Sequence, residues 1–583
     1  MSNDRADVFG QGCTGRDMRL LLLIGGCALV LLYTAFLGRY GVLQQTEARY
    51  AEVAREMKAS RDFLMPTLNG VPHVQKPPVT YWLTAGSMAL FGENEIGARV
   101  PPLVAGLGTL ALTAWIGMLW FNRRIGLLAL IILAGFVEFY ALSRTLCADM
   151  IMTFWSTAAI AAFAFAAGRK AHPSVLRFVP FFVFMGIAFA TKGPMGIVVP
   201  LCTTAAWQLH VRRQGGPGQK IPWRTGMSIT FALASAWFLA VAWRHPDLWD
   251  YFVKYEFVDR FFSKVHGRSQ PFWYFLPVLA GGLLPWSSLA VPLAFRNLRA
   301  GTSGSSNQPI WALAGWIVVP LVLLSLSGSK LATYILPLLP GIAIWLAFHL
   351  EYLAPSRPLT VAVLVQMSAL LIAALAPVVA LSMGGARSCG IALDFWFLPV
   401  WLASMGMAMA ASWTMRRGVA LRRASALSLS TLLALAALSS QIDRLAPVMG
   451  TSVSLRPLAE RIMREPDWKH AQIVVAGAQA HGMEFYLRRL VDCTRKEAEI
   501  VLPQTPELAA RIHPTSRDIR FATDGAPIYV VTKERNLRRG EFPELEWDVV
   551  QRTGSFVLLL RQPPSPVRVA GMAGDHASTP QGL

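Results

Sequence analysis

Long apolar segments separated by short polar loops dominate the chain. From about residue 20 to residue 442, runs of about 18 or more apolar residues recur, and each is long enough to cross a bilayer. We therefore predict an all-α polytopic membrane protein with about thirteen transmembrane helices. The predicted spans lie near residues 20–37, 97–120, 125–143, 150–168, 178–191, 194–210, 226–243, 272–294, 309–326, 332–350, 358–382, 390–413 and 424–442.

Two segments between the first and second spans follow a different pattern. Residues 46–58 alternate charged and apolar side chains at helical spacing, which predicts an amphipathic helix. Residues 79–93 are apolar but short, with Tyr81 and Trp82 at one end, which is typical of a helix lying at the membrane interface. We expect both to be juxtamembrane helices on the outer surface, within residues 46–93.

The C-terminal region has the mixed pattern of a small α/β domain. Strand-like runs cover residues 472–477, 527–533 and 555–561, and helical patterns cover residues 457–465 and 506–512. This alternation predicts a soluble domain over residues 444–565, which follows a transmembrane domain over residues 1–443. Residues 566–583 are rich in Gly, Pro and Ser, so we expect a disordered tail.

Composition and charge support a membrane protein and set its orientation. Apolar residues make up 54% of the chain and charged residues only 15%, against about 25% in soluble proteins. The net charge is +20, but sixteen Lys and Arg residues against one acid, Glu351, fall in alternate short loops. By the positive-inside rule these loops are cytoplasmic, which places the N-terminus inside and the C-terminal region outside. The charge therefore sets topology, and we expect no nucleic-acid partner.

Polar residues collect on the predicted outer face. They are Glu47, Arg49, Lys76, Arg144, Asp149, Lys192, Arg260, His266, Arg268 and Lys330. Taken singly, each has a structural alternative: Glu47 suits the first turn of a helix, Asp149 suits an N-cap, and a lysine can snorkel to the interface. As a set, converging cations with two carboxylates predict a site for an anionic lipid headgroup.

Motifs along residues 46–340 carry a family resemblance. The run TEARYAEVAREM is followed by QKPPVTYWL, FGENEIGARVP, SRTLCADMIMTF, ATKGPMGIVVP, EFVDRF, HGRSQPFWYFLPVL, LLPWS and SGSKLATYILPLLP. In this order they resemble the lipid-carrier-dependent glycosyltransferases of the protein mannosyltransferase and aminoarabinose lipid A transferase superfamily. The resemblance implies a GT-C fold in the bacterial inner membrane, with the active site and the α/β domain on the periplasmic face.

The resemblance also implies a reaction. A sugar, pentosyl or hexosyl, would move with inversion from an undecaprenyl-phosphate carrier to lipid A, another glycolipid or a protein. The leaving lipid phosphate is a stable anion, so it needs cations rather than a general acid. Glu47 and Asp149 are the acids that remain on the outer face, and they are our candidates for catalysis. Our candidates for substrate and lipid-phosphate binding are Arg49, Lys76, Lys192, Arg260, His266, Arg268, Lys330 and Tyr334.

Three positions depart from the family pattern. Thr46 stands where the family has an acidic residue, Gln75 replaces a glutamate, and Phe257 replaces a histidine. The last two resemble metal-ligand positions, and losing a carboxylate and an imidazole together removes good metal ligands. We therefore expect no metal cofactor, and Glu47 or Asp149 must supply any base.

Other functional classes remain open from the sequence. A transporter would show charges buried in mid-span or paired broken helices, whereas here the charges gather at one face. The tyrosines Tyr50, Tyr81 and Tyr334 are also typical of interfacial anchors. A non-catalytic or degenerate protein that binds polyprenyl phosphate or glycolipid stays open, because of the three departures. The retained cations, with Glu47 and Asp149, favour an active enzyme.

Overall fold

The computed structural model describes most of the transmembrane region and much of the C-terminal region. The described residues are 15–43, 46–168, 175–216, 218–250, 270–290, 293, 308–351, 361, 364, 365, 368, 372, 397–415, 421–442, 454–477, 481–494, 510–513, 515, 519, 521, 526–542 and 547–561. Phe257, Arg260, His266 and Arg268 lie outside them. So do the tail 566–583 and most of the predicted span 358–382.

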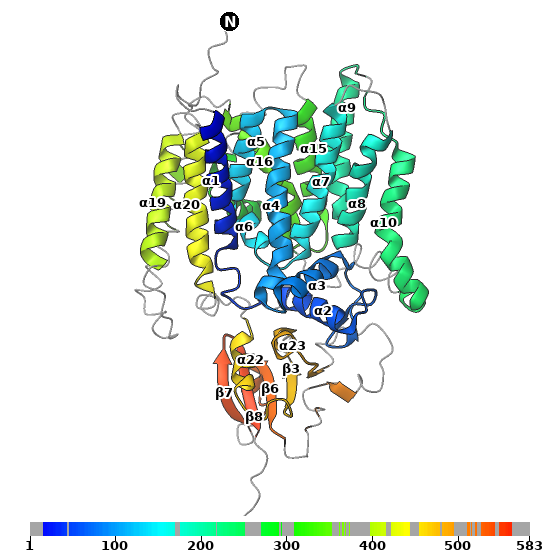
Figure 1. Cartoon of the computed structure of the whole chain (residues 1–583), viewed down its shortest axis with the longest axis vertical. Helices are drawn as coiled ribbons and strands as arrows, with labels where there is room; N and C mark the ends of the chain where they lie inside the picture. The colour runs from blue at the N-terminus through cyan, green and yellow to red at the C-terminus, as the bar shows by residue number, and fades with distance from the viewer. Residues whose placement is uncertain are drawn as a thin grey trace, which may run out of the picture.

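Most of the long helices stand side by side as an upright bundle (Figure 1). The helices of this region are α1 (Gly15–Thr34), α4 (Glu95–Trp120), α5 (Arg123–Ala134), α6 (Val137–Ser143), α7 (Ala148–Gly168), η1 (Val175–Phe178), α8 (Val179–Lys192), α9 (Met195–Arg213), α10 (Trp223–Arg244), α11 (Leu248–Asp250), α13 (Phe275–Gly282), α15 (Gln308–Leu326), η3 (Ala332–Leu338), α16 (Leu339–Glu351), α19 (Phe397–Met415) and α20 (Leu421–Ser439).

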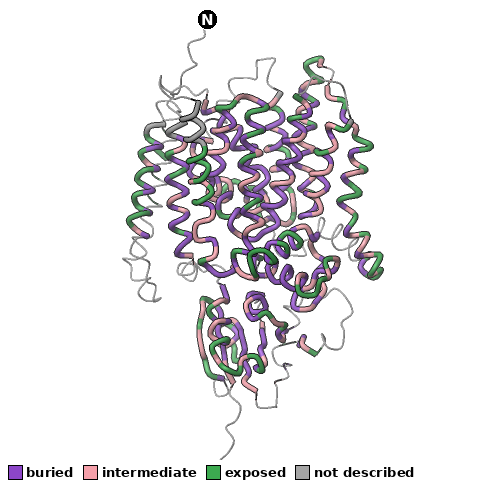
Figure 2. The backbone as a smooth tube through the Cα atoms, viewed as in Figure 1, coloured by how far each residue is buried: buried purple, intermediate pink, exposed green. Residues whose placement is uncertain are grey.

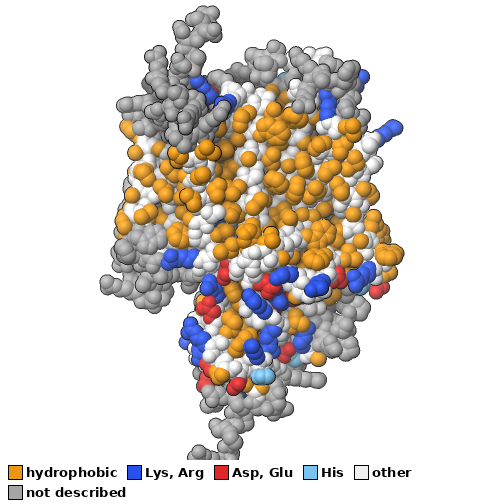
Figure 3. Space-filling model, viewed as in Figure 1, with side chains coloured by type: hydrophobic (Ala, Val, Ile, Leu, Met, Phe, Trp, Pro, Cys, Tyr) orange, Lys and Arg blue, Asp and Glu red, His pale blue; other side chains and the backbone are white. Residues whose placement is uncertain are grey.

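The bundle has the surface expected of a membrane domain. A broad hydrophobic band covers it, and charged side chains gather below that band (Figure 3). Buried residues concentrate in the interior helices, whereas α10, at one side of the bundle, has only five buried residues among its 22 (Figure 2). Among the described residues, five helices are long and apolar enough to cross a membrane, or six if one bent pair counts as a span. The number thirteen stays a prediction.

Two predicted spans are wrong as continuous helices. Span 125–143 divides into α5 and α6, which meet at 72°. The break falls at Gly135, where α20 packs so closely that a Cβ would lie 2.6 Å from the hydroxyl of Ser428. Span 272–294 divides after Gly282, where α13 ends. The two breaks meet, because the backbone N–H of Val137 donates to the carbonyl of Leu284 (3.2 Å).

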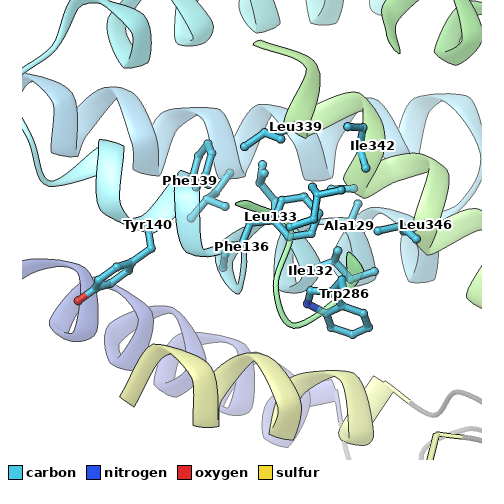
Figure 4. Close-up of a cluster of buried hydrophobic side chains, with 14 of the residues drawn as sticks. Ala129, Ile132, Leu133, Phe136, Phe139, Tyr140, Trp286, Leu339, Ile342 and Leu346 are labelled. Atoms are coloured by element: carbon cyan, nitrogen blue, oxygen red, sulfur yellow. The ribbon is translucent and has the colours of Figure 1, made fainter. Parts of the chain in front are cut away.

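A dense apolar cluster holds these breaks in place. Buried side chains from α5, α6 and α16 gather there with Trp286 (Figure 4). Irregular backbone at membrane depth is tolerated only where protein buries it or where it lines a polar cavity. The packing around Phe136 and Trp286, both 0% exposed, supplies that burial.

The segment after α1 lies across the lower end of the bundle in Figure 1. It contains α2 (Thr46–Ser60), β1 (Thr67–Leu68), β2 (Val71–Pro72) and α3 (Val79–Phe91). The place of α2 and α3 on the outer surface of the membrane stays a prediction. Helix α2 is more buried than an amphipathic pattern suggests, since ten of its fifteen residues are buried. The reason is tertiary: α3 packs against α2, and so does a helix of the C-terminal region, α23 (His481–Leu487).

The C-terminal region forms a six-stranded sheet with helices beside it. Its elements are α22 (Arg456–Met463), β3 (Gln472–Ala476), α23, β4 (Asp492–Thr494), β5 (Ile512–His513), β6 (Ile528–Lys533), α25 (Glu534–Arg538), β7 (Asp548–Thr553) and β8 (Phe556–Arg561). The strand order is β5-β4-β3-β6-β8-β7, in which the first four are parallel and the last two join antiparallel. Strands occur at all three predicted runs, whereas the boundaries 444–565 stay a prediction.

Specific polar contacts fasten this sheet to the rest of the chain. The hydroxyl of Tyr486 accepts from the N–H of Val42 (2.7 Å) and donates to Glu95 (3.0 Å). The side chain of Asn69 bonds both backbone groups of Val491, at 3.0 and 2.9 Å. The C-terminal region therefore rests on α2, the β1–β2 hairpin and the start of α4, and it holds α2 against the bundle.

Candidate functional site

Three predicted site residues from distant segments meet at the end of α8. The Nζ of Lys192 donates to a carboxylate oxygen of Asp149, which lies in the first turn of α7. The same Nζ lies 4.8 Å from the ring centroid of Tyr334, in η3. Helix α8 ends at Lys192 because Gly193 takes a positive φ of 103°. This turn leaves the lysine side chain 15% exposed beside its two partners.

Helix α2 brings Arg49 and Tyr50 to the same place. Tyr50 interacts electrostatically with Lys192, Arg49 and Asp149. Burial raises the pKa of Tyr50, and the charges of Lys192 and Arg49 oppose that rise. The ring of Tyr50 lies 5.3 Å from that of Tyr81, and both side chains are buried. The alternative of interfacial anchors is therefore wrong for this pair.

Lys76, in the loop between the β1–β2 hairpin and α3, adds a further cation. His73 is buried, with its ring 6.5 Å from that of Tyr81. Burial lowers the pKa of His73 well below its usual value, and the charges of Arg49, His481 and Lys76 lower it further. His73 thus lies within electrostatic range of both Arg49 and Lys76. We call Arg49, Lys76 and Lys192, together with Asp149, Tyr50 and Tyr334, the cation cluster.

Glu47 has a different environment from the one expected of a base. Its two carboxylate oxygens accept from Nε and Nη2 of Arg99, each at 2.8 Å. They also accept from the backbone N–H groups of Leu43 (2.7 Å) and Leu146 (3.0 Å). A carboxylate has about four lone-pair sites, and these contacts occupy them. The geometry favours a structural role for Glu47, in which it fixes the start of α2 against α4 and α7.

Arg99 is the residue that sequence reasoning missed in this pair. Its guanidinium also donates to the carbonyls of Leu37, Tyr40 and Gly41, so it closes the turn between α1 and α2. The available signal was a lone charge near the start of an apolar span, which is costly without a partner.

The hydrogen bonds of Lys330 favour a structural role. It is 6% exposed, and its Nζ donates to the carbonyls of Gln270 (3.0 Å) and Ser327 (2.6 Å). Its predicted contact with lipid phosphate stays a prediction. The same holds for Arg260, His266 and Arg268, which lie outside the described residues.

The residues at the expected metal position do not make a good donor set. Within the described part of the chain, no three His, Cys, Asp or Glu side chains group closely enough to hold a metal ion. Gln75 offers an amide oxygen where the resemblance expects a carboxylate, and amides are poor ligands for zinc. We derive no step through a metal, and a metal-free reaction stays a prediction.

Comparison with known proteins shows which family the chain resembles. A family model of dolichyl-phosphate-mannose-protein mannosyltransferases matches residues 19–252. An undecaprenyl phosphate-alpha-4-amino-4-deoxy-L-arabinose arabinosyl transferase 2 of Sodalis glossinidius is 32% identical over 328 residues. The corresponding transferase of Edwardsiella ictaluri is 33% identical over 332 residues. Over more than half of its length, the chain is similar to transferases of the protein mannosyltransferase and aminoarabinose transferase superfamily. The alignments cover 55% and 56% of this chain and 58% of each of these two relatives.

Comparison with a solved structure identifies the fold of the chain. The crystal structure of ArnT from Cupriavidus metallidurans bound to undecaprenyl phosphate matches with a TM-score of 0.72 and 22% identity. The match covers 93% of this chain and 98% of that one. The chain therefore has the GT-C membrane fold. The family resemblance suggested by the motifs is confirmed by the similarity to these transferases.

One argument against a transporter needs correction. The sequence suggested no paired broken helices and no charge within a span, but the breaks after α5 and α13 meet. Glu138, which sequence reasoning missed, lies in α6 directly after the first break. A lone carboxylate inside the apolar run 125–143 was its signal. Similarity to transferases, rather than the helix pattern, now argues against transport.

Proposed function

We propose that the protein is an integral membrane glycosyltransferase. It moves a sugar from a polyprenyl-phosphate-linked donor to an extracytoplasmic acceptor, which is lipid A, another glycolipid or a protein. The cation cluster is the observation that carries this proposal. Arg49, Lys76 and Lys192 come from three separate segments, and each is partly exposed. Arg49 and Lys192 lie within electrostatic range of Tyr50, and Arg49 and Lys76 lie within electrostatic range of His73. Several cations converging beside hydrogen-bond donors suit a phosphate headgroup.

The cluster suggests how the transfer proceeds. The lipid phosphate leaves the anomeric carbon as an anion, and the cluster neutralises the charge that develops on it. Before the donor binds, Asp149 is paired with Lys192. An incoming phosphate competes for the lysine and thereby frees the carboxylate. Asp149 then accepts a proton from a hydroxyl acceptor, whereas a phosphate acceptor needs only positioning. Direct displacement inverts the anomeric centre.

We place the protein in the bacterial inner membrane, with the cluster and the C-terminal sheet on the periplasmic side. The bias of basic residues toward alternate loops supports this orientation. A reporter fused after Arg444 should score as periplasmic, and one fused at Gly216 should score as cytoplasmic. The opposite pattern would place the cluster in the cytoplasm and refute the proposal.

The acceptor and the activity can be tested together in cells. Mass spectrometry of lipid A, surface polysaccharides and glycoproteins should reveal a sugar that a deletion strain loses. Wild-type protein should restore it, and Lys76→Ala should not. Unchanged products in the deletion strain, with retained binding of undecaprenyl phosphate by the purified protein, would instead support a non-catalytic lipid-binding protein. The departures at Thr46 and Gln75 are the observations that favour that second candidate.

A further inference from the structure

Tyr486, in α23, joins the C-terminal sheet to the segment that precedes α2. Its hydroxyl accepts from the N–H of Val42 (2.7 Å) and donates to Glu95 (3.0 Å). Its ring packs both against the apolar core of the sheet and against the apolar cluster around α2 and α3. Tyr486 is therefore a direct link between the two regions, and the proposed transfer does not use it.

A short path leads from Val42 to the cation cluster. The next residue, Leu43, is bonded twice to the first turn of α2. Its N–H donates to Glu47 (2.7 Å), and its carbonyl accepts from the N–H of Ala48 (3.0 Å). Arg49, a member of the cation cluster, follows Ala48 directly. A displacement of Val42 therefore passes through Leu43 to the turn that carries Arg49.

The turn before α2 is held from two sides. On the side of the bundle, Arg99 donates to the carbonyl of Gly41 (2.9 Å). On the side of the sheet, a Cβ at Gly41 would lie only 2.1 Å from Oγ of Ser454 and 2.8 Å from the hydroxyl of Tyr486. Any larger residue would push these two side chains away. Glycine at this position lets the sheet approach the turn closely.

The two holds are not interchangeable, because they satisfy different backbone groups. Arg99 binds carbonyls of the turn, whereas Tyr486 supplies an acceptor for the N–H of Val42. Val42 is 0% exposed, and a buried backbone N–H without a partner is costly. Without the hydroxyl, this segment must shift to find another acceptor, even when the Glu47–Arg99 pair is intact.

We propose that Tyr486 is a positioning residue for the donor site, and that its hydroxyl acts through Arg49. This rests on the proposed function, in which the cation cluster binds the lipid phosphate of the donor. The hydroxyl fixes Val42, Val42 and Leu43 fix the first turn of α2, and that turn aims Arg49 at the phosphate. The C-terminal sheet thus contributes to donor binding through the position of α2.

The test measures the affinity of the purified full-length protein in detergent for undecaprenyl phosphate, with thermal unfolding recorded on the same preparations. Tyr486→Phe removes the hydroxyl and keeps the ring. It should weaken binding by about two-fold to ten-fold, the range of one hydrogen bond. Tyr529→Phe removes the hydroxyl of another buried tyrosine of the same sheet, in β6, and should keep the wild-type affinity.

A double-mutant cycle distinguishes positioning from a general loss of stability. If Tyr486 acts through Arg49, then Tyr486→Phe should have almost no effect on affinity in an Arg49→Ala background. In a Lys192→Ala background its full effect should remain, because Lys192 comes from α8 and still leaves Arg49 to be positioned. A variant that merely loosens the fold would weaken binding equally in both backgrounds.

A second pair of variants tests the same link without removing the hydroxyl. Gly41→Ala pushes Ser454 and Tyr486 away and should also weaken binding in an Arg49-dependent way, which keeps the proposal testable if Tyr486→Phe does not fold. Gly86→Ala, in α3, adds a Cβ with nothing within 4 Å and should bind as the wild type does.

Three results would overturn the role of Tyr486. They are wild-type affinity in folded Tyr486→Phe, wild-type affinity in folded Gly41→Ala, and an effect of Tyr486→Phe that is as large in the Arg49→Ala background as in the wild type. Failure of the wild-type protein to bind undecaprenyl phosphate would instead overturn the proposed function.

Discussion

Breaking the Glu47–Arg99 pair should unfold the protein before it affects the chemistry. Both side chains are almost fully buried, at 1% and 0% exposure, and two parallel hydrogen bonds of 2.8 Å join them. Removing one partner of a buried ion pair costs about 3–5 kcal/mol, because the other charge stays buried and unpaired. Glu47→Ala and Arg99→Ala should each lower the free energy of unfolding by about this amount.

Two companion variants separate charge from shape. Glu47→Gln keeps the shape, but all four partners of the carboxylate are donors, so the amide nitrogen must face a donor. It should therefore destabilise the protein as well. The pair Glu47→Leu with Arg99→Met removes both charges and should recover part of the loss. Recovery is partial because the carbonyls of Leu37, Tyr40 and Gly41 lose their donor.

Denaturant unfolding in detergent gives the stabilities, and sugar transfer is measured on the same preparations below their unfolding midpoints. We expect the two single alanine variants to be non-additive in a double-mutant cycle, as contacting residues are. We also expect each folded fraction to retain activity. A Glu47→Gln protein with wild-type stability and no transfer would refute this reasoning and restore Glu47 as the base.

The other predictions concern the cation cluster and its surroundings. Lys76→Ala should abolish transfer in a folded protein, and Lys76→Arg should rescue only partly, because a point charge and a planar fork are not interchangeable; full activity of the alanine variant in a transfer assay would remove Lys76 from the site. His73 is held neutral by burial, so only the unfolded state gains its proton as the pH falls through about 6.5. Stability should therefore decline from pH 7 to pH 5, and His73→Phe should flatten that decline in thermal unfolding. Transfer should survive a strong chelator, whereas loss that one divalent ion restores would reveal a metal site.

Local sequence pattern predicted the helices well where one apolar run makes one straight helix. Helices α8 and α15 fall at their predicted places, and strands β3, β6 and β8 fall at theirs. The sequence did not reveal the helix breaks after α5 and α13, because neither break changes the hydropathy of its apolar run. Gly135 interrupts an apolar run without changing its polarity, and the reason for the break is the approach of α20 from about 290 residues later in the chain.

Burial of charged residues in α2 shows the same limit. The amphipathic pattern of residues 46–58 gave no sign that Glu52 and Arg55 are buried, yet they are 0% and 7% exposed. They bond each other at 2.8 and 2.7 Å. Helix α23, more than 400 residues later in the chain, covers them. One local signal was missed: the Asn69–Gly70 turn joins β1 to β2 with positive φ at both residues. An Asn-Gly pair is a strong hairpin signal.

The sequence motifs predicted part of the candidate site. The order of the motif blocks pointed to Asp149, Lys192 and Tyr334, and the structure brings these three together. The role of Glu47 was not accessible, because it depends on Arg99, which lies 52 residues away in sequence. A carboxylate in a motif cannot be called a base until its hydrogen-bond partners are known.

The partners of the acids therefore decide how this chain can work without the family's first acidic residue. Arg99 holds Glu47, and this ion pair fixes the position of the start of α2. Asp149 is held by Lys192, which is also a phosphate-binding candidate, so the arrival of the donor and the release of this acid are coupled. The carboxylate of Glu138 has no hydrogen-bond partner among the described residues. With Thr46 unable to act as a base, positioning and charge carry more of the reaction, and a phosphate acceptor, which needs no base, suits this site better than a hydroxyl.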